Sequence, residues 1–208
     1  MRDVRLYVEG GGDGAETKAT LRIAFSDFLA PIRDHFRARA HWNVIVCGGR
    51  SQTYEKFCDG LRHYPEALNL LLVDSENRLA TGMRWNHVAQ RTGDAWAKPP
   101  EATEESLHFM VVVMETWFLA DVETMQMFYG KGFKAASLPK HNDLEQIAKR
   151  NIEVGLRAAT RRTAAGEYKK IKHGAAILKK LNSAKVRAKA THCEKLFRCL
   201  ATELGVIA

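Results

Sequence analysis

The sequence predicts an α/β protein with a Rossmann-like, parallel four-stranded sheet flanked by helices and a basic helical extension at its C-terminal end. Three observations predict this fold. Four apolar runs have the length of buried strands, the segments between them carry apolar residues at helical spacing, and glycines or carboxylates follow each run. Strands that alternate with helices pair in parallel through right-handed crossovers. We expect residues 1–130 to form the α/β core and residues 131–208 to form the extension packed on it.

The first predicted unit opens with the apolar run 4–8, which stops at Glu9 and a stretch of glycines. Glycine adopts positive φ angles and lets the backbone approach a ligand, so this loop has the composition of a phosphate-sized binding loop. Residues 17–40 follow with helical apolar spacing, and Pro31 is a point where that helix can kink or split.

Two further units repeat this pattern. Residues 42–47 predict a strand, and a helix is expected over residues 51–63 with Ser51 as its N-cap. Residues 68–73 form an almost unbroken apolar run, which is typical of a parallel strand covered on both faces. The polar, weakly periodic segment 77–105 predicts a long loop with at most one short helix.

The fourth strand is predicted at residues 108–114, and Glu115 stands between it and the next helix. Short helices are then predicted from apolar spacing and from breaks at Gly and Asn-Ser. They cover residues 121–128, 142–150, 151–164, 173–181 and 191–204.

Charge is distributed unevenly along the chain. The net charge is +8, but residues 1–148 hold 17 Lys and Arg against 20 Asp and Glu, whereas residues 149–208 hold 15 against 4. No apolar run reaches the roughly 20 residues of a membrane span, and no apolar leader precedes the first strand, so we expect a cytoplasmic protein without a membrane partner. Cys47, Cys58, Cys193 and Cys199 form no Cys-x-x-Cys pair and are expected to be reduced thiols in or near the core, not zinc ligands.

Carboxylates follow three of the four predicted strands. The carboxyl ends of parallel strands lie at one edge of the sheet, so these side chains should meet there. Crowded carboxylates are costly unless a cation neutralises them, and oxygen ligands without clustered Cys or His favour Mg²⁺ or Mn²⁺. The candidate metal ligands are Glu9, Asp13, Asp74, Glu76 and Glu115. An acid just past a strand is also often a helix cap or a solvated residue, and for Asp13 a structural role in the glycine loop is the leading interpretation.

The same acids suggest a chemistry. A divalent ion held by Asp74 and Glu76 would withdraw charge from a phosphate oxygen, while Glu9 would bind a second ion or act as a base toward water. Arg50, beside two glycines, and Lys18, in the first helix, are candidates to contact phosphate. The alternative for both is an ordinary solvated charge.

Four sequence blocks carry a family resemblance. They are Val-Glu-Gly-Gly-Gly-Asp at 8–13, Cys-Gly-Gly-Arg at 47–50, Leu-Val-Asp-Ser-Glu at 72–76 and Met-Glu-Thr-Trp-Phe-Leu-Ala-Asp at 114–121. The chain resembles the TOPRIM domain shared by topoisomerases, primases and the overcoming-lysogenization-defect nucleases. More narrowly, and over nearly its whole length, it resembles a family of small, stand-alone bacterial TOPRIM-like proteins of unknown function.

That resemblance implies Mg²⁺-dependent cleavage, transfer or priming of nucleic-acid strands, with Glu9 as an acid, base or metal ligand and Asp74 as the first metal-binding acid. Glu76 stands where the family usually has a second Asp. Its extra methylene moves the carboxylate about 1.5 Å further out, which puts its catalytic role in doubt. Small relatives occur beside ATPases in phage-defence systems, so the resemblance also implies a possible partner ATPase.

The basic residues of the C-terminal quarter occur in clusters that suit a phosphate backbone, so DNA or RNA is the expected counter-surface. The clusters nominated for this role contain Arg161, Arg162, Lys169, Lys170 and Lys172. A solubilising face or a docking site for an acidic protein is the alternative.

Two other functions stay open. The first is a non-catalytic TOPRIM-like adaptor or sensor that binds nucleic acid or a partner ATPase, which Glu76 favours. The second is nucleotide binding, since Gly10-x-Gly12-x-x-Ala15 fits the dinucleotide fingerprint. Against it, Glu9 would repel a pyrophosphate, and no acid ends the 42–47 strand to hold a ribose. The sequence decides neither between DNA and RNA nor the oligomeric state.

Overall fold

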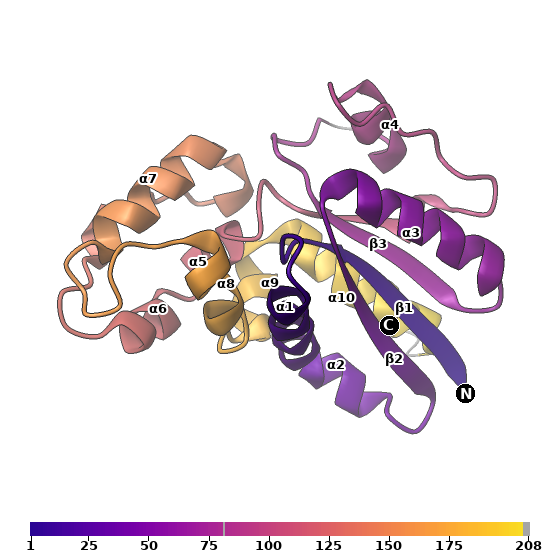
Figure 1. Cartoon of the computed structure of the whole chain (residues 1–208), viewed down its shortest axis with the longest axis horizontal. Helices are drawn as coiled ribbons and strands as arrows, with labels where there is room; N and C mark the ends of the chain where they lie inside the picture. Colours follow the sequence, from indigo (N-terminus) through magenta and orange to yellow (C-terminus); the bar gives the residue numbers. More distant parts are fainter. Residues whose placement is uncertain (81, 206–208) are drawn as a thin grey trace.

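A computed structural model describes residues 1–80 and 82–205 of the chain. At its centre is a four-stranded, all-parallel sheet in the order β2-β1-β3-β4, which confirms the predicted fold class (Figure 1). The strands are β1 (Arg2–Glu9), β2 (Ala40–Gly48), β3 (Leu68–Asp74) and β4 (Leu107–Met110). All seven residues of β3 are buried, as its continuous apolar run predicts.

Helices cover both faces of the sheet (Figure 1). α3 (Arg50–His63) and α4 (Arg84–Gln90) pack on one face, and α1 (Ala15–Phe28) and α10 (Thr191–Glu203) pack on the other. The other α-helices of the described residues are α2 (Ala30–His35), α5 (Thr116–Ala120), α6 (Val122–Tyr129), α7 (Lys149–Thr160), α8 (Lys170–Leu178) and α9 (Ser183–Lys189). Short 3-10 turns are η1 (Glu104–Ser106), η2 (Ala135–Ser137) and η3 (Leu144–Gln146). No helix in these ranges has the length and apolar character of a membrane span.

Three predicted boundaries before residue 115 are wrong. The helix expected to reach residue 40 ends at His35. Its expected break at Pro31 is confirmed: the helix is split into α1 and α2, and Pro31 lies in the first turn of α2, where its missing N–H breaks no helical bond. Gly49, not Ser51, is the N-cap of α3. The fourth strand ends at Met110, and the apolar residues 111–114 are buried without joining the sheet.

The helices after residue 130 were located less well by their apolar spacing. The predicted helices 142–150 and 151–164 correspond to the turn η3 and to α7, which ends at Thr160. α9 was not predicted at all. It has only seven residues and is rich in Lys and Arg, so its apolar pattern is short.

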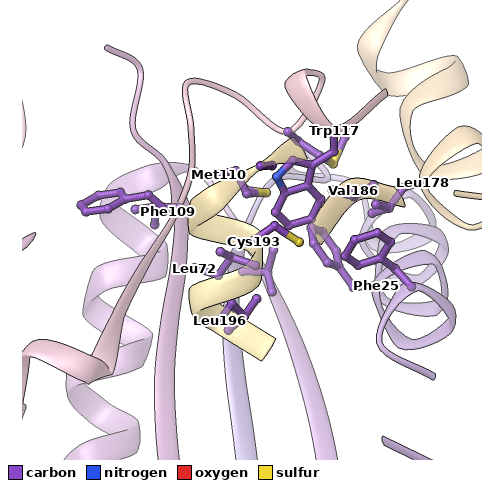
Figure 2. Close-up of a cluster of buried hydrophobic side chains, with 14 of the residues drawn as sticks. Phe25, Leu72, Phe109, Met110, Trp117, Leu178, Val186, Cys193 and Leu196 are labelled. Carbon is purple, nitrogen blue, oxygen red and sulfur yellow. The ribbon is translucent and has the colours of Figure 1, made fainter. Parts of the chain in front are cut away.

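One apolar core joins the sheet to the later helices. Figure 2 shows Phe25 of α1, Leu72 of β3, Trp117 of α5 and Cys193 of α10 pointing into the same buried cluster, together with Leu178 of α8. All four cysteines are free thiols, and three of them are buried, with only Cys58 partly accessible. The prediction of unpaired thiols in or near the core agrees with this placement.

Asp121 connects the N-terminus of α6 to the start of α9. Its buried carboxylate accepts hydrogen bonds from the Thr124 hydroxyl at 2.7 Å, the Asn182 N–H at 3.0 Å and Lys185 Nζ at 3.1 Å. Burial alone would raise the pKa of Asp121, but these donors outweigh it and lower the pKa. A lowered folded-state pKa stabilises the fold above the unfolded-state value of about 4, and this stability is lost as the pH falls further.

We expect Asp121→Asn to reduce the free energy of unfolding by about 1–3 kcal/mol at pH 7, because charge-assisted hydrogen bonds to a buried carboxylate are lost. The difference from the wild type should shrink below pH 4. Urea unfolding at pH 7 and pH 3 measures both effects. Glu123→Gln is the matched control, since Glu123 also pairs with Lys185 but its side chain is 82% exposed. Equal losses in the two variants would contradict the role given to burial.

Candidate metal centre

The loop after β1 needs its glycines. Gly10, Gly11 and Gly12 have φ angles of 132°, 81° and 58°, which side chains rarely adopt. A Cβ on Gly11 would lie 3.1 Å from the Lys18 backbone, so the loop is folded tightly against the start of α1. The Gly10 N–H donates to the Gly48 carbonyl at 2.9 Å and fixes the loop against the end of β2. This backbone forms one wall of the site.

Three of the predicted metal ligands converge beside this loop. Glu9 ends β1, Asp74 ends β3, and Glu76 follows two residues later; one carboxylate oxygen from each lies within 4.8 Å of the others. The convergence follows from the sheet, because β1 and β3 are neighbours and parallel. Glu76 has a φ of 66°, an uncommon angle for a residue with a side chain, and its N–H donates to the Val112 carbonyl at 2.8 Å. That bond helps to fix Glu76 beside the other two acids.

Asp74 lies deepest, with 3% of its surface exposed. Its Oδ1 accepts the Met114 N–H at 2.8 Å, and its Oδ2 accepts a hydrogen bond from Lys170 Nζ at 3.1 Å. Burial raises the pKa of Asp74 to about 7; Lys170 opposes this shift, and the negative charges of Glu9 and Glu115 add to it. A carboxylate with this pKa is held in an environment that favours an added positive charge.

Glu9 is oriented through one oxygen. Its Oε2 accepts hydrogen bonds from Arg50 Nη1 at 2.9 Å and from the Asp74 backbone N–H at 3.2 Å. Its Oε1 makes no hydrogen bond within the described part of the chain. Burial raises the pKa of Glu9 against the opposing effect of Arg50. Glu9 therefore presents a free carboxylate oxygen whose affinity for a proton or a cation is increased.

Arg50 was expected to contact phosphate, but its donors are already used within the protein. Nε and Nη2 bond the two oxygens of Asp94 at 2.7 and 2.8 Å, Nη1 bonds Glu9, and the guanidinium lies 4.9 Å from the Trp96 ring centre. Its side chain is 12% exposed. Arg50 is therefore placed to hold Glu9, and a phosphate would have to displace these bonds.

Asp94 was missed in the sequence because it lies in the polar, aperiodic segment 77–105. Its side chain is 2% exposed and bonds both Arg50 and Arg91. We expect Asp94→Asn to lower the free energy of unfolding by about 2–3 kcal/mol, since a charged hydrogen-bonding partner of a largely buried Arg is lost. Its Mn²⁺ affinity should fall about tenfold, because Glu9 is then held less well.

Urea unfolding and calorimetric Mn²⁺ titration measure the effects of Asp94→Asn. Asp59→Asn is the control, because Asp59 also pairs with an Arg but is 55% exposed. We expect this control to change the free energy of unfolding by less than about 0.5 kcal/mol. If Asp94→Asn binds Mn²⁺ as tightly as the wild type does, then Asp94, and with it the segment 77–105, does not position Glu9.

Two lysines, at the first positions of α7 and α8, contact the acids. Lys149 Nζ lies 2.5 Å from Glu76 Oε2, and Lys170 Nζ lies 3.5 Å from Glu115 Oε2 in addition to its bond with Asp74. Burial would lower the pKa of Lys170, but Asp74 and Glu115 outweigh it and raise the pKa. Nothing in the sequence links residue 149 to residue 76, so these pairs could not have been found by spacing.

Glu115 lies beside the three acids but is not one of the converging group. Its Oε1 accepts the Tyr168 hydroxyl at 2.8 Å, and its buried Oε2 has no hydrogen-bond partner among the described residues. Asp13, by contrast, is exposed and also stands outside the group. Lys18 lies beside this loop and the end of β2. Its Nζ is so close to Gly48 that a Cβ on that glycine would lie 3.0 Å from it.

The donor set fits a hard divalent cation. All the converging ligands are carboxylate oxygens, two of them with raised pKa values. Glu115 Oε2 nearby is buried and accepts no hydrogen bond from the described residues, and only the ammonium of Lys170, at 3.5 Å, offsets its charge within that part of the chain. Glu9, Asp74 and Lys170 border a cavity of about 40 Å³ beside Gly10 and Gly11, which has room for water molecules. Glu9, Asp74 and Glu76 are the residues that would hold Mg²⁺ or Mn²⁺, in competition with the two lysines.

The basic residues nominated for nucleic acid divide into two groups. Arg161, Arg162, Lys169 and Lys172 are exposed on and around α7 and α8. Lys170 is also accessible, with 48% of its side chain exposed, but its ammonium points to Asp74 and Glu115. The exposed group can therefore contact an anionic surface while Lys170 reaches the acids.

Comparison with known proteins gives one match. The model of a protein family described as a domain of unknown function (DUF4276) matches residues 8–201. No curated protein and no solved structure matches the chain. The matched range begins in β1 and ends in α10, so it contains the three converging acids and both lysines that contact them. The chain therefore belongs to the DUF4276 family.

Proposed function

We propose that this chain is a TOPRIM-like protein that uses Mg²⁺ or Mn²⁺ to cleave or transfer phosphodiester bonds of nucleic acid. The observation that carries the proposal is the convergence of Glu9, Asp74 and Glu76 within 4.8 Å at the carboxyl ends of two neighbouring parallel strands. Acids in this arrangement favour bound cations, and nucleic-acid chemistry commonly uses hard divalent ions. The free thiols agree with a reducing, cytoplasmic location.

The residues of the chain divide the work. Asp74 and Glu76 offer oxygens from one strand end, and Glu9 offers a third from the next strand. A bound Mg²⁺ or Mn²⁺ supplies the positive charge that polarises a phosphate oxygen and acidifies water. Glu9, with its raised pKa, can accept a proton at Oε1 as general base.

Two basic residues support these acids. Arg50 keeps Glu9 in place through its bond to Oε2. Lys170, next to Asp74 and half-exposed, can donate a hydrogen bond to a phosphate oxygen.

The direct test is cleavage by the purified protein. Labelled single-stranded DNA, double-stranded DNA and RNA are incubated with Mg²⁺, Mn²⁺ or EDTA, with and without the products of neighbouring genes. We expect cleavage of at least one substrate that requires the metal. Absence of cleavage under all these conditions, together with absence of Mn²⁺ binding by calorimetry, would contradict the proposal.

A second candidate function is favoured by the ion pairs of Lys149 and Lys170. These ammonium groups neutralise Glu76 and Asp74 without any metal, so the scaffold could serve as a non-catalytic adaptor or sensor that binds nucleic acid or a partner ATPase. Nucleic-acid binding that is unchanged by EDTA and unaccompanied by hydrolysis would favour this function over the first.

Binding of nucleic acid should depend on the exposed basic residues. We expect the triple variant Arg161→Ala, Arg162→Ala, Lys169→Ala to bind DNA or RNA more weakly, with the slope of log affinity against log salt reduced by about 2–3 as phosphate contacts are lost. Fluorescence anisotropy at several salt concentrations measures this slope. The control removes the same charge elsewhere, at the exposed residues Arg22, Arg37 and Arg39. Equal effects in both triples would indicate only a response to net charge.

A further inference from the structure

A second group of ligand-type side chains lies away from the acids. Glu105, His108 and Cys199 each offer a ligand atom, and these atoms all lie within 4.8 Å of one another. They come from η1, β4 and α10, so the fold brings together residues that are 94 positions apart. The group sits near the start of β4, whereas Asp74 is paired with Met110 at the other end of that strand. The two groups are therefore separate sites.

We propose that Glu105, His108 and Cys199 bind a Zn²⁺ ion. Sulfur, nitrogen and oxygen donors together suit zinc, while Mg²⁺ prefers oxygen alone. A tetrahedral zinc ion with bonds of about 2.0–2.3 Å keeps its donor atoms about 3.3–3.8 Å apart, so the ligands need to close by about 1 Å. Glu105 can make this movement because its side chain is 56% exposed. Water takes the fourth position.

His108 gives independent support. Its side chain is buried, with 2% exposed, and its Nε2 has no hydrogen-bond partner among the described residues. An unpaired polar atom in the interior is unfavourable, so such a group calls for a ligand. The next residue, Phe109, packs against His87 of α4 on one face of the sheet, so His108 points to the opposite face, where α10 lies.

Cys199 is largely buried but borders a groove, with 7% of its surface exposed. Among the described residues, its thiol donates one weak hydrogen bond, to the Glu105 carbonyl oxygen at 3.8 Å. Cys199 and Glu105 both line an open groove of about 380 Å³, so two of the three proposed ligands border solvent-accessible space. On binding, the thiol becomes a zinc-bound thiolate and its proton passes to solvent.

Arg84 pairs with the carboxylate of Glu105. Its guanidinium donates to both Glu105 oxygens at 3.0 Å and to the Leu107 carbonyl at 3.2 Å. A carboxylate has about four acceptor sites, so Glu105 keeps room for an ion, and a donor of this kind orients a ligand in the way outer residues of metal sites do. Because Arg84 also reduces the negative charge of Glu105, the main bonds to zinc come from His108 and Cys199.

The spacing of the cysteines in the sequence does not predict this zinc site. Sequence patterns for zinc depend on pairs such as Cys-x-x-Cys, and the four cysteines of this chain form none. Here a single Cys meets His and Glu only after α10 has packed on β4. An ion at this point would fasten the last helix to the sheet.

Titration of the full-length, metal-free protein with Co²⁺ tests the proposal, because Co²⁺ bound to a thiolate gives a near-ultraviolet charge-transfer band. We expect one Co²⁺ per chain with this band, and its loss on addition of Zn²⁺. Cys199→Ser should abolish the band, and Glu105→Gln should weaken Co²⁺ binding about tenfold. Cys193→Ser is the matched control, since Cys193 lies on the same helix but points into the apolar cluster (Figure 2).

Two results would overturn the site: a wild-type protein that gives no thiolate band, or a band that persists in Cys199→Ser. Alkylation of the native wild type avoids reliance on the folding of variants. Zn²⁺ should slow modification of Cys199 at least tenfold and leave Cys58, which is partly exposed, unchanged. The site would also be overturned if Zn²⁺ protected both thiols from alkylation, or if it protected neither. Asp74→Asn should retain zinc binding, so failure of the acidic centre and failure of this site are distinguishable.

Discussion

An Asp74→Asn protein should lose metal-stimulated cleavage by about a thousandfold or more, which corresponds to about 4 kcal/mol of transition-state stabilisation. The substitution removes one charge from the three converging acids and leaves Lys170 beside a neutral amide. The fold should survive, because Oδ1 of the new side chain can still accept the Met114 N–H that Asp74 accepts at 2.8 Å. The effect is therefore expected on metal affinity and rate, with little change in stability.

Mn²⁺ titration by calorimetry, cleavage assays and thermal unfolding separate these effects for Asp74→Asn. Asp13→Asn provides the control, because this substitution removes the same charge close to the same glycine loop. Asp13 is exposed and is not one of the converging acids. The Asp13→Asn protein should bind Mn²⁺ and cleave as the wild type does. If Asp74→Asn retains Mn²⁺ affinity and cleavage, the acids at the sheet edge are not the metal centre.

Replacing Trp117 with Ala should cost about 3–5 kcal/mol of the free energy of unfolding, the range for deleting a large aromatic side chain from a core. Trp117 is 1% exposed and stacks on Phe28, with ring centres 4.9 Å apart and planes inclined by 15°. It also meets Phe25 edge-on at 6.4 Å. Figure 2 shows its ring in the middle of the cluster that joins α1, β3 and α10. Its removal leaves a cavity that these rigid neighbours cannot fill.

Urea denaturation of Trp117→Ala, with circular dichroism as the probe, gives this value. Trp117→Phe should cost less, because a ring is retained and because the buried Nε1 of Trp117 has no hydrogen-bond partner among the described residues to lose. Met127→Ala, at a side chain that is 76% exposed, should stay within about 0.5 kcal/mol of the wild type. A loss below about 1 kcal/mol in Trp117→Ala would mean that α5 is not part of the central core.

The strands were predictable because burial of a parallel sheet leaves a direct trace in the sequence. The run 68–73 has no polar residue except Asn69, and the strand extends only one residue beyond it, to Asp74. Glu9 and Asp74 could be placed at one edge because parallel strands end together. The extent of β4 could not be predicted, since residues 111–114 are as apolar as a strand but are buried outside the sheet.

The partners of the acids were beyond sequence reasoning. Asp94 lies in a segment with no periodicity, and its importance depends on that loop folding back so that Asp94 and Trp96 both contact Arg50. Lys149 and Lys170 are 73 and 96 positions away from the acids they contact. Their charges were visible in the basic C-terminal quarter, but composition does not show which ammonium turns inward and which faces solvent.

The order β2-β1-β3-β4 has a consequence for where any ligand can approach. After β1 the chain moves outward to β2, and after β2 it returns across β1 to β3, so the connecting helices leave β1 and β3 toward opposite faces. Between those two strands the layers diverge, and open α/β sheets have their natural crevice at this reversal. Glu9, at the end of β1, and Asp74, at the end of β3, lie on the two sides of this crevice. The strand order of the backbone therefore creates this crevice, and the side chains determine only which ligand binds in it.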